Sequence, residues 1–123
     1  MSVDVKKDPS GLFIVSIKGI FTDSDRKEME SSARAVIGRT RTIHVLLLAD
    51  AFSGWSKKGD WGNLDFMNEY DPVMEKIAVV ADEKWRDEML MYLGAGLRRA
   101  AVSFFPSRSE DKARAWLQGR YES

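Results

Sequence analysis

Few side chains in this sequence are of the types that perform catalysis. His44 is the single histidine, and it stands between Ile43 and Val45 in an apolar run. A histidine in such a run more often bonds within a sheet, or is exposed on its edge, than acts as a general base. Ser53 precedes a glycine, but the G-x-S-x-G pattern of a nucleophile elbow is absent. We therefore predict that the chain is not an enzyme and has no catalytic residue.

Metal and cofactor chemistry have equally little support. Oxygen ligands of the kind that Mg²⁺ prefers occur in the middle of the chain at Asp50, Asp60, Asp65 and Asp71. Helix capping and ordinary surface charge explain these residues more simply. Gly94-Ala95-Gly96 ends a helical pattern instead of following a strand, so it is a poor dinucleotide fingerprint. The chain lacks cysteine, which excludes disulfides, thiol chemistry and Cys-ligated zinc. We predict no metal and no cofactor.

Aromatic side chains are more informative than the titratable ones. An apolar run ends at Asp50, and Phe52 and Trp55 follow on either side of Gly54. Small-molecule sites are apolar clefts with a few polar anchors, and α/β sheets place them beyond the carboxyl ends of their strands. The pattern predicts a cleft for a small apolar or amphipathic, lipid-like ligand. Its predicted lining residues are Phe52, Trp55, Trp61, Trp85 and Met89.

Neighbouring residues would complete such a cleft. Ser53, Ser56 and Lys57 are candidate polar anchors. Met91 and Tyr92 would extend the wall, because methionine adapts to irregular ligands. The alternative is that the aromatic side chains fold back and cap the sheet without forming a site.

Length and composition exclude several classes of protein. The 123 residues suffice for one domain, so residues 1–123 are expected to form a single unit. Nineteen basic residues balance nineteen acidic ones, which gives no electrostatic reason to expect nucleic acid as a partner. The longest apolar run, Val45–Ala49, is far too short to span a membrane. No signal peptide is visible at the N-terminus, so we expect a cytoplasmic protein.

Strand and helix patterns alternate along the chain. The predicted strands are Val3–Val5, Leu12–Ile17, Ile43–Ala49, Ile77–Ala81 and Ala100–Phe105. Helices are predicted to begin at Thr22, near Trp61, at Asp82, and at Ser107 or Ser109, and the segment Asp50–Lys58 is predicted to be a loop. Met29, Ala33, Val36 and Ile37 share one face of the first helix. This order predicts an α/β domain with a mixed, mostly parallel sheet, an N-terminal hairpin and about four helices.

Three segments together resemble the SpoIIAA-like family. Leu48–Trp55 has the form L-x-D-x-F-x-G-W, and Lys76–Trp85 has a basic residue, an apolar strand, an acidic residue and a tryptophan. Phe104-Phe105-Pro106 followed by Ala113–Leu117 is similar to the family's ending. The resemblance implies a bacterial protein with a STAS-related, CRAL-TRIO-like fold, and it carries over no catalytic residue. Tyr70-Asp71 departs from the histidine-containing helix end of many relatives.

The resemblance also implies an alternative function. In STAS-type anti-sigma-factor antagonists, a serine near the corresponding strand end is phosphorylated, and this controls binding to a protein partner. Ser53 and Ser56 stand near that place, although the bulky Phe52 and Trp55 depart from a small, polar loop. We also expect a homodimer, formed through exposed aromatic side chains or the strand edge at Val3–Val5.

Overall fold

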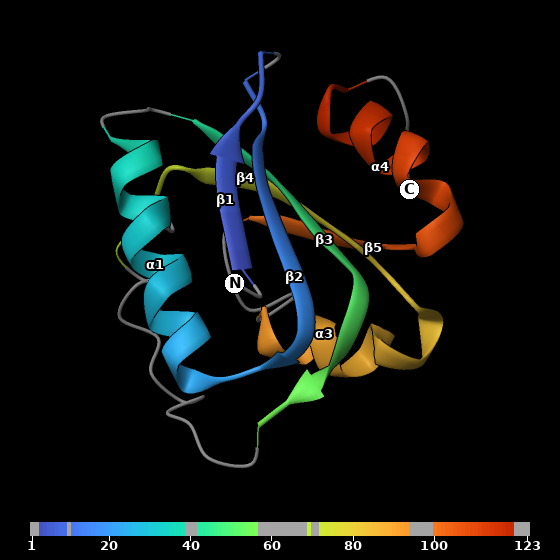
Figure 1. The fold of residues 1–123 in the computed structure, drawn as a ribbon. Coiled ribbons are helices and arrows are strands. Elements are labelled where there is room, and N and C mark those ends of the chain that lie inside the picture. Colours follow the sequence, from blue (N-terminus) through green and yellow to red (C-terminus); the bar gives the residue numbers. More distant parts are fainter. Residues whose placement is uncertain are drawn as a thin grey trace.

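A five-stranded sheet is the centre of the fold. The computed structural model describes residues 3–9, 11–38, 42–56, 69, 72–93 and 100–119. The strands lie in the order β1 (Val3–Lys7), β2 (Phe13–Phe21), β3 (Ile43–Trp55), β4 (Met74–Ala81) and β5 (Ala101–Pro106). β1 is antiparallel to β2, and the other neighbouring pairs are parallel (Figure 1). The predicted mixed sheet with an N-terminal hairpin is therefore confirmed.

Three α-helices lie in the described part of the chain. They are α1 (Asp23–Ile37), α3 (Arg86–Tyr92) and α4 (Glu110–Leu117). The short 3-10 turns η1 (Glu83–Trp85) and η2 (Ser107–Ser109) lead into α3 and α4. The fourth predicted helix was placed near residues 61–71, of which all but residue 69 lie outside the described residues.

Two predicted helix starts are formed by side-chain caps. The Thr22 hydroxyl accepts a hydrogen bond from the backbone N–H of Asp25 (3.1 Å), and the Asp25 carboxylate accepts one from the N–H of Thr22 (3.0 Å). This reciprocal capping box satisfies two backbone donors that a helix otherwise leaves free. The Asp82 carboxylate accepts from the N–H of Lys84 (3.0 Å) and starts η1 in the same way.

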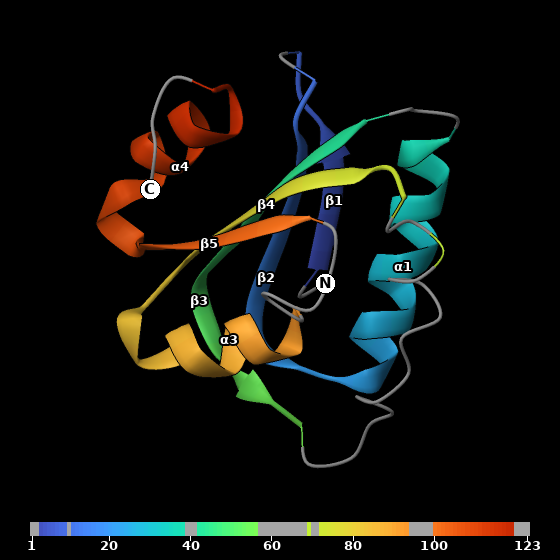
Figure 2. The ribbon, with the colours of Figure 1, turned by 180° about the vertical axis from the view of Figure 1, so that it is seen from behind.

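The sheet lies between two helical layers. α1 and α3 cover one face, and α4 covers the other (Figures 1 and 2). Alternate residues of β4 face the two layers. Ile77 and Val79 belong to the core beneath α1 and α3, and Ala78 and Val80 belong to the core beneath α4. A strand that is buried on both faces reads as a continuous apolar run, as the sequence predicted for β4.

The predicted loop from Asp50 is wrong as far as Trp55, because β3 continues through it. β2 is also longer than predicted, and Ala51, Phe52, Gly54 and Trp55 pair with its residues 18–21. Two register shifts interrupt this pairing, and Gly54 has a φ of +119°, which side-chain-bearing residues rarely adopt. A glycine in an irregular strand resembles a loop signal when read from the sequence.

Candidate functional site

An aromatic cluster joins the ends of β2 and β3 to η1 and α3. We define it as Phe21, Phe52, Trp55, Trp85 and Tyr92. The ring centroids of Phe52 and Trp55 lie 4.7 Å apart and those of Phe52 and Trp85 lie 5.0 Å apart, with interplanar angles of 77° and 74°. Trp55 and Trp85 also meet at a steep angle, 81°, with centroids 6.1 Å apart. These edge-to-face contacts are the geometry that aromatic quadrupoles favour.

Tyr92 connects the aromatic cluster to the rest of the core. Its ring centroid lies 5.8 Å from that of Trp55 and 6.2 Å from that of Phe21. Because Tyr92 belongs to α3 while its two neighbours end β3 and β2, these contacts fix the last turn of α3 against the sheet. A movement of α3 would therefore change the surroundings of Trp55.

Gly54 allows the Trp85 ring to lie directly on the backbone of β3. A Cβ atom at Gly54 would approach the Cη2 atom of Trp85 to 3.2 Å, which is tighter than ordinary van der Waals contact. The buried indole nitrogen of Trp85 has no hydrogen-bond partner among the described residues.

The structure brings four of the five predicted ligand-binding residues together. Phe52 and Met89 are buried, and Trp55 and Trp85 are half-buried against the same core. Trp61 lies outside the described residues. The rings of Phe52, Trp55 and Trp85 contact one another closely. Phe52 and Met89 have little exposed surface. A ligand role for these residues stays a prediction.

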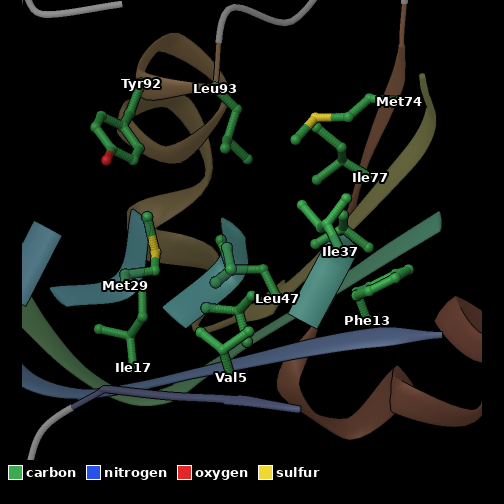
Figure 3. Close-up of a pocket in the computed structure, with 13 residues that line it drawn as sticks. Val5, Phe13, Ile17, Met29, Ile37, Leu47, Met74, Ile77, Tyr92 and Leu93 are labelled. Atoms are coloured by element: carbon green, nitrogen blue, oxygen red, sulfur yellow. The ribbon is translucent and has the colours of Figure 1, made fainter. Parts of the chain in front are cut away.

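An apolar cavity lies next to the aromatic cluster, between the sheet, α1 and the end of α3 (Figure 3). Its volume is about 70 Å³. The described residues that line it are Val5, Phe13, Val15, Ile17, Met29, Ala33, Ile37, Val45, Leu47, Met74, Ile77, Tyr92 and Leu93. Tyr92 is shared by the cavity and the aromatic cluster, and it carries the one side-chain oxygen among these residues.

Sequence reasoning identified Tyr92 as a wall residue but missed the cavity itself. Its lining residues on β1, β2 and α1 were placed only on strands and on one helix face, because apolar periodicity does not distinguish a filled core from one with a void. One sequence feature could have indicated the cavity. Ala33 is a small side chain on the buried face of α1, between the larger Met29 and Ile37.

Asp23, Arg26 and Glu30 form a charged cluster on α1, and its arginine is buried. The Arg26 side chain is 5% exposed; its Nη1 lies 3.0 Å from Oε2 of Glu30, and its Nη2 lies 3.0 Å from Oδ1 of Asp23. Nε of Arg26 also donates to Asp23 (3.1 Å). Burial by itself would lower the pKa of Arg26, but its hydrogen bonds to Glu30 and Asp23 outweigh burial and raise it. Arg26 is therefore a permanent cation held by two carboxylates.

Tyr92 lies within the electrostatic reach of this charged cluster. Burial, reinforced by the negative charge of Glu30 and opposed by Arg26, raises the pKa of Tyr92 to about 12. The phenol is consequently neutral near pH 7 and able to donate a hydrogen bond.

His44, the histidine considered as a general base, lies away from the aromatic cluster. It occupies the beginning of β3, and its Nε2 is 2.9 Å from Oε1 of Glu75. Both residues line an open hollow of about 460 Å³ that also includes Lys76. The Lys76 ammonium donates to the backbone oxygen of Trp116 (3.0 Å) and lies over the Trp116 ring, so it is already engaged at the end of α4.

The two candidate phosphorylation sites differ in exposure. Ser53 is exposed on the extended part of β3, whereas Ser56 is half-buried and its backbone N–H donates to the oxygen of Phe21 (2.9 Å). The third candidate anchor, Lys57, lies outside the described residues. Ser53 is therefore the more accessible of the two serines.

The described residues contain no group of three or more His, Cys, Asp or Glu side chains arranged to hold a metal ion. Asp60, Asp65 and Asp71 lie outside the described residues. Within the same part of the chain, no helix has the length and apolar character needed to cross a membrane.

Comparison with known proteins supports the fold and gives the family. No curated protein matches the chain. A solved structure of an uncharacterized protein of Shewanella loihica PV-4, from the DUF3478 family with a SpoIIAA-like fold, superposes with a TM-score of 0.69. It is 15% identical and the match covers 94% of this chain and 91% of that chain. The SpoIIAA-like family model matches residues 12–118, and the chain therefore belongs to the SpoIIAA-like family.

Proposed function

We propose that this protein is a non-enzymatic binding module for a small apolar or amphipathic ligand. The observation that carries the proposal is the cavity of about 70 Å³ between the sheet, α1 and α3. Protein interiors are close-packed, with few voids larger than a water molecule. A void with an almost wholly apolar lining is a poor site for water and a good one for a hydrocarbon group.

The size of the cavity limits what it can hold with the helices in these positions. An engineered apolar cavity of about 150 Å³ binds benzene, so about 70 Å³ accommodates only part of such a molecule. A longer ligand would need α3 to move outward. α3 is seven residues long, and Met91 on its outer side is 78% exposed, so no described element holds that side of the helix in place.

The predicted aromatic residues have a defined role in this proposal. Tyr92 lines the cavity and its ring contacts Trp55, which in turn contacts Phe52 and Trp85. If a ligand displaces Tyr92, the aromatic rings become the wall of the enlarged site. Phe52, Trp55, Trp85 and Met89 would then support the ligand from the side of the strand ends.

The test is a titration of the protein with a series of straight-chain alcohols from butanol to octanol. Saturable changes in tryptophan fluorescence are expected, because Trp55 contacts Tyr92. Ala33→Val, which places two carbon atoms into the cavity, should abolish binding. Ala35→Val, on the exposed side of the same helix, is the matched control and should bind normally. Equal binding by both variants would contradict the cavity as the site.

Regulated docking to a protein partner is the second candidate, and the exposure of Ser53 favours it. A phosphate on Ser53 would add about two negative charges at an accessible strand end. Ser53→Asp should then change the set of proteins retained by the immobilised chain, while Ser53→Ala should behave as the unmodified protein. Identical retention by both variants, with no phosphate on protein isolated from its own cells, would remove this candidate.

A homodimer is also part of the proposal. In the described sheet β1 and β5 are the edge strands, and the edge of a strand offers free backbone groups to another chain. Native mass spectrometry of protein purified without added ligand would give the subunit number and any retained small molecule together. A monomer at all concentrations would refute the dimer and leave the ligand proposal unaffected.

A further inference from the structure

We propose that the open hollow where β3 and β4 begin is a second binding site, which accepts small zwitterions of the amino-acid type. The hollow has a volume of about 460 Å³, which is within the range of small-molecule sites. It lies on the face of the sheet that α4 covers, whereas the apolar cavity lies beneath α1 and α3. The inference is therefore independent of the ligand proposed for that cavity.

A β-bulge brings polar side chains together in this hollow. Ile43 pairs with Met74. The next residue of β3, His44, pairs with Lys76, so Glu75 is an extra residue in β4. Bulges turn a side chain away from the face that a regular strand would give it, and they are common next to functional sites. Here the bulged residue places its Oε1 atom 2.9 Å from Nε2 of His44, next to Lys76.

The walls of the hollow are held in place by contacts between distant elements. The turn between β1 and β2 forms one wall and the end of α4 forms another. Both lie at the end of the molecule where β3 begins (Figures 1 and 2). Nη1 of Arg114 on α4 lies 3.5 Å from Oδ2 of Asp8 in the turn, and Asp8 also accepts from the backbone N–H of Leu12 (3.0 Å). A site with fixed walls loses less conformational entropy when a ligand binds.

The charged groups of the hollow can make more hydrogen bonds than the contacts described above. An ammonium group has three N–H donors, and one of those on Lys76 serves the backbone oxygen of Trp116. The Glu75 carboxylate has two oxygens, of which Oε1 faces His44, and its side chain is 59% exposed. A ligand can therefore reach both groups without breaking the contacts that they make.

Opposite charges on neighbouring residues define the class of ligand. An anion would be attracted by Lys76 and repelled by Glu75, and a cation would be attracted by Glu75 and repelled by Lys76. A zwitterion can place its ammonium group towards Glu75 and its carboxylate towards Lys76, so that both charges contribute. Because the hollow is open, water screens these contacts and the binding should be weak. The geometry therefore favours a zwitterion over an ion of either single charge.

The experiment uses four probes: alanine, β-alanine, propionate and ethylamine. Propionate is either amino acid without its ammonium group, and ethylamine is either one without its carboxylate. Each probe is titrated into the full chain at one fixed pH, and the amide signals of Gly11, Gln118 and Gly119, which line the hollow, are followed by NMR. At least one of the two zwitterions should give saturable shifts and bind about two- to fivefold more tightly than propionate and ethylamine, the usual value of one exposed ion pair.

Two variants exchange the preference of the site. Glu75→Gln removes the negative charge and should weaken the zwitterion while strengthening propionate. Lys76→Met keeps the apolar stem over the Trp116 ring and should weaken the zwitterion while strengthening ethylamine. Glu88→Gln and Lys112→Met, at exposed positions of α3 and α4, are the matched controls and should bind all four probes as the unmodified protein does.

Three results would overturn the proposal. They are the absence of saturable shifts at the hollow with either zwitterion, propionate or ethylamine binding as tightly as both zwitterions, and an unchanged order of affinities in Glu75→Gln and Lys76→Met. None of these results bears on the apolar cavity, because the probes report on the other face of the sheet.

Discussion

Replacing Ala33 with valine should stabilise the protein, because the new atoms enter a void. Ala33 is buried on α1 and lines the cavity of about 70 Å³. Cavities cost roughly 24 cal/mol per Å³, so filling this one completely would contribute about 1.7 kcal/mol. Two added carbon atoms at about 0.8 kcal/mol each give a similar value.

Valine is also a poorer helix former than alanine, by roughly 0.6 kcal/mol. The net gain expected for Ala33→Val is therefore about 1 kcal/mol in the free energy of unfolding. For a domain of this size that corresponds to a rise in melting temperature of roughly 4 °C. Ala35 is exposed on the same helix, so Ala35→Val incurs the helix cost without filling anything.

Urea denaturation of both variants and of the unmodified protein measures the effect. The difference between the two variants should be about 1.7 kcal/mol, since the helix cost cancels. A cavity that is already filled, or that is closed at Ala33, would instead make the buried valine overpack the core. Ala33→Val being no more stable than Ala35→Val would therefore refute the reasoning from the cavity.

Three other predictions concern strain, ionisation and buried charge. Gly54→Ala should destabilise the protein by about 1–3 kcal/mol in urea denaturation, because its φ of +119° is unfavourable for alanine and the Cβ meets Trp85; an unchanged stability would contradict the strain. The pKa of Tyr92 is raised from 10.0 to about 12. The stabilisation of the fold that follows from this shift is therefore complete below pH 10, and it is lost as the pH rises toward 12. The free energy of unfolding should fall over that window by at most about 3 kcal/mol, and an equal fall in Tyr92→Phe would show that other groups cause it. Arg26→Met leaves two carboxylates without their buried cation and should lower the free energy of unfolding by about 3 kcal/mol. Lys27 is exposed, so Lys27→Met should lower it by under about 0.5 kcal/mol. Similar thermal shifts for the two variants would contradict the role of the buried Arg26.

The sequence alone determined the order of the elements and the type of the sheet. Strands buried on both faces, such as β4, carry continuous apolar runs, and helix starts at Thr22 and Asp82 carry their own capping side chains. These signals are local, because hydrogen bonds within a few residues and the periodicity of burial produce them. The types of Phe52, Trp55, Trp85 and Met89, which the fold brings into one core, were also recognisable from the sequence.

Tertiary structure decided where β3 ends, where the cavity lies and what surrounds it. The strand continues to Trp55 because β2 offers paired backbone groups as far as Phe21, and pairing between distant segments leaves no local sign in an irregular, glycine-containing stretch. The cavity depends on how side chains from the sheet, α1 and α3 fail to fill a shared space, which no single element encodes. The raised pKa of Tyr92 likewise depends on burial and on the charges of Glu30 and Arg26 on α1, because the electrostatic environment of a side chain is a property of the folded assembly of elements.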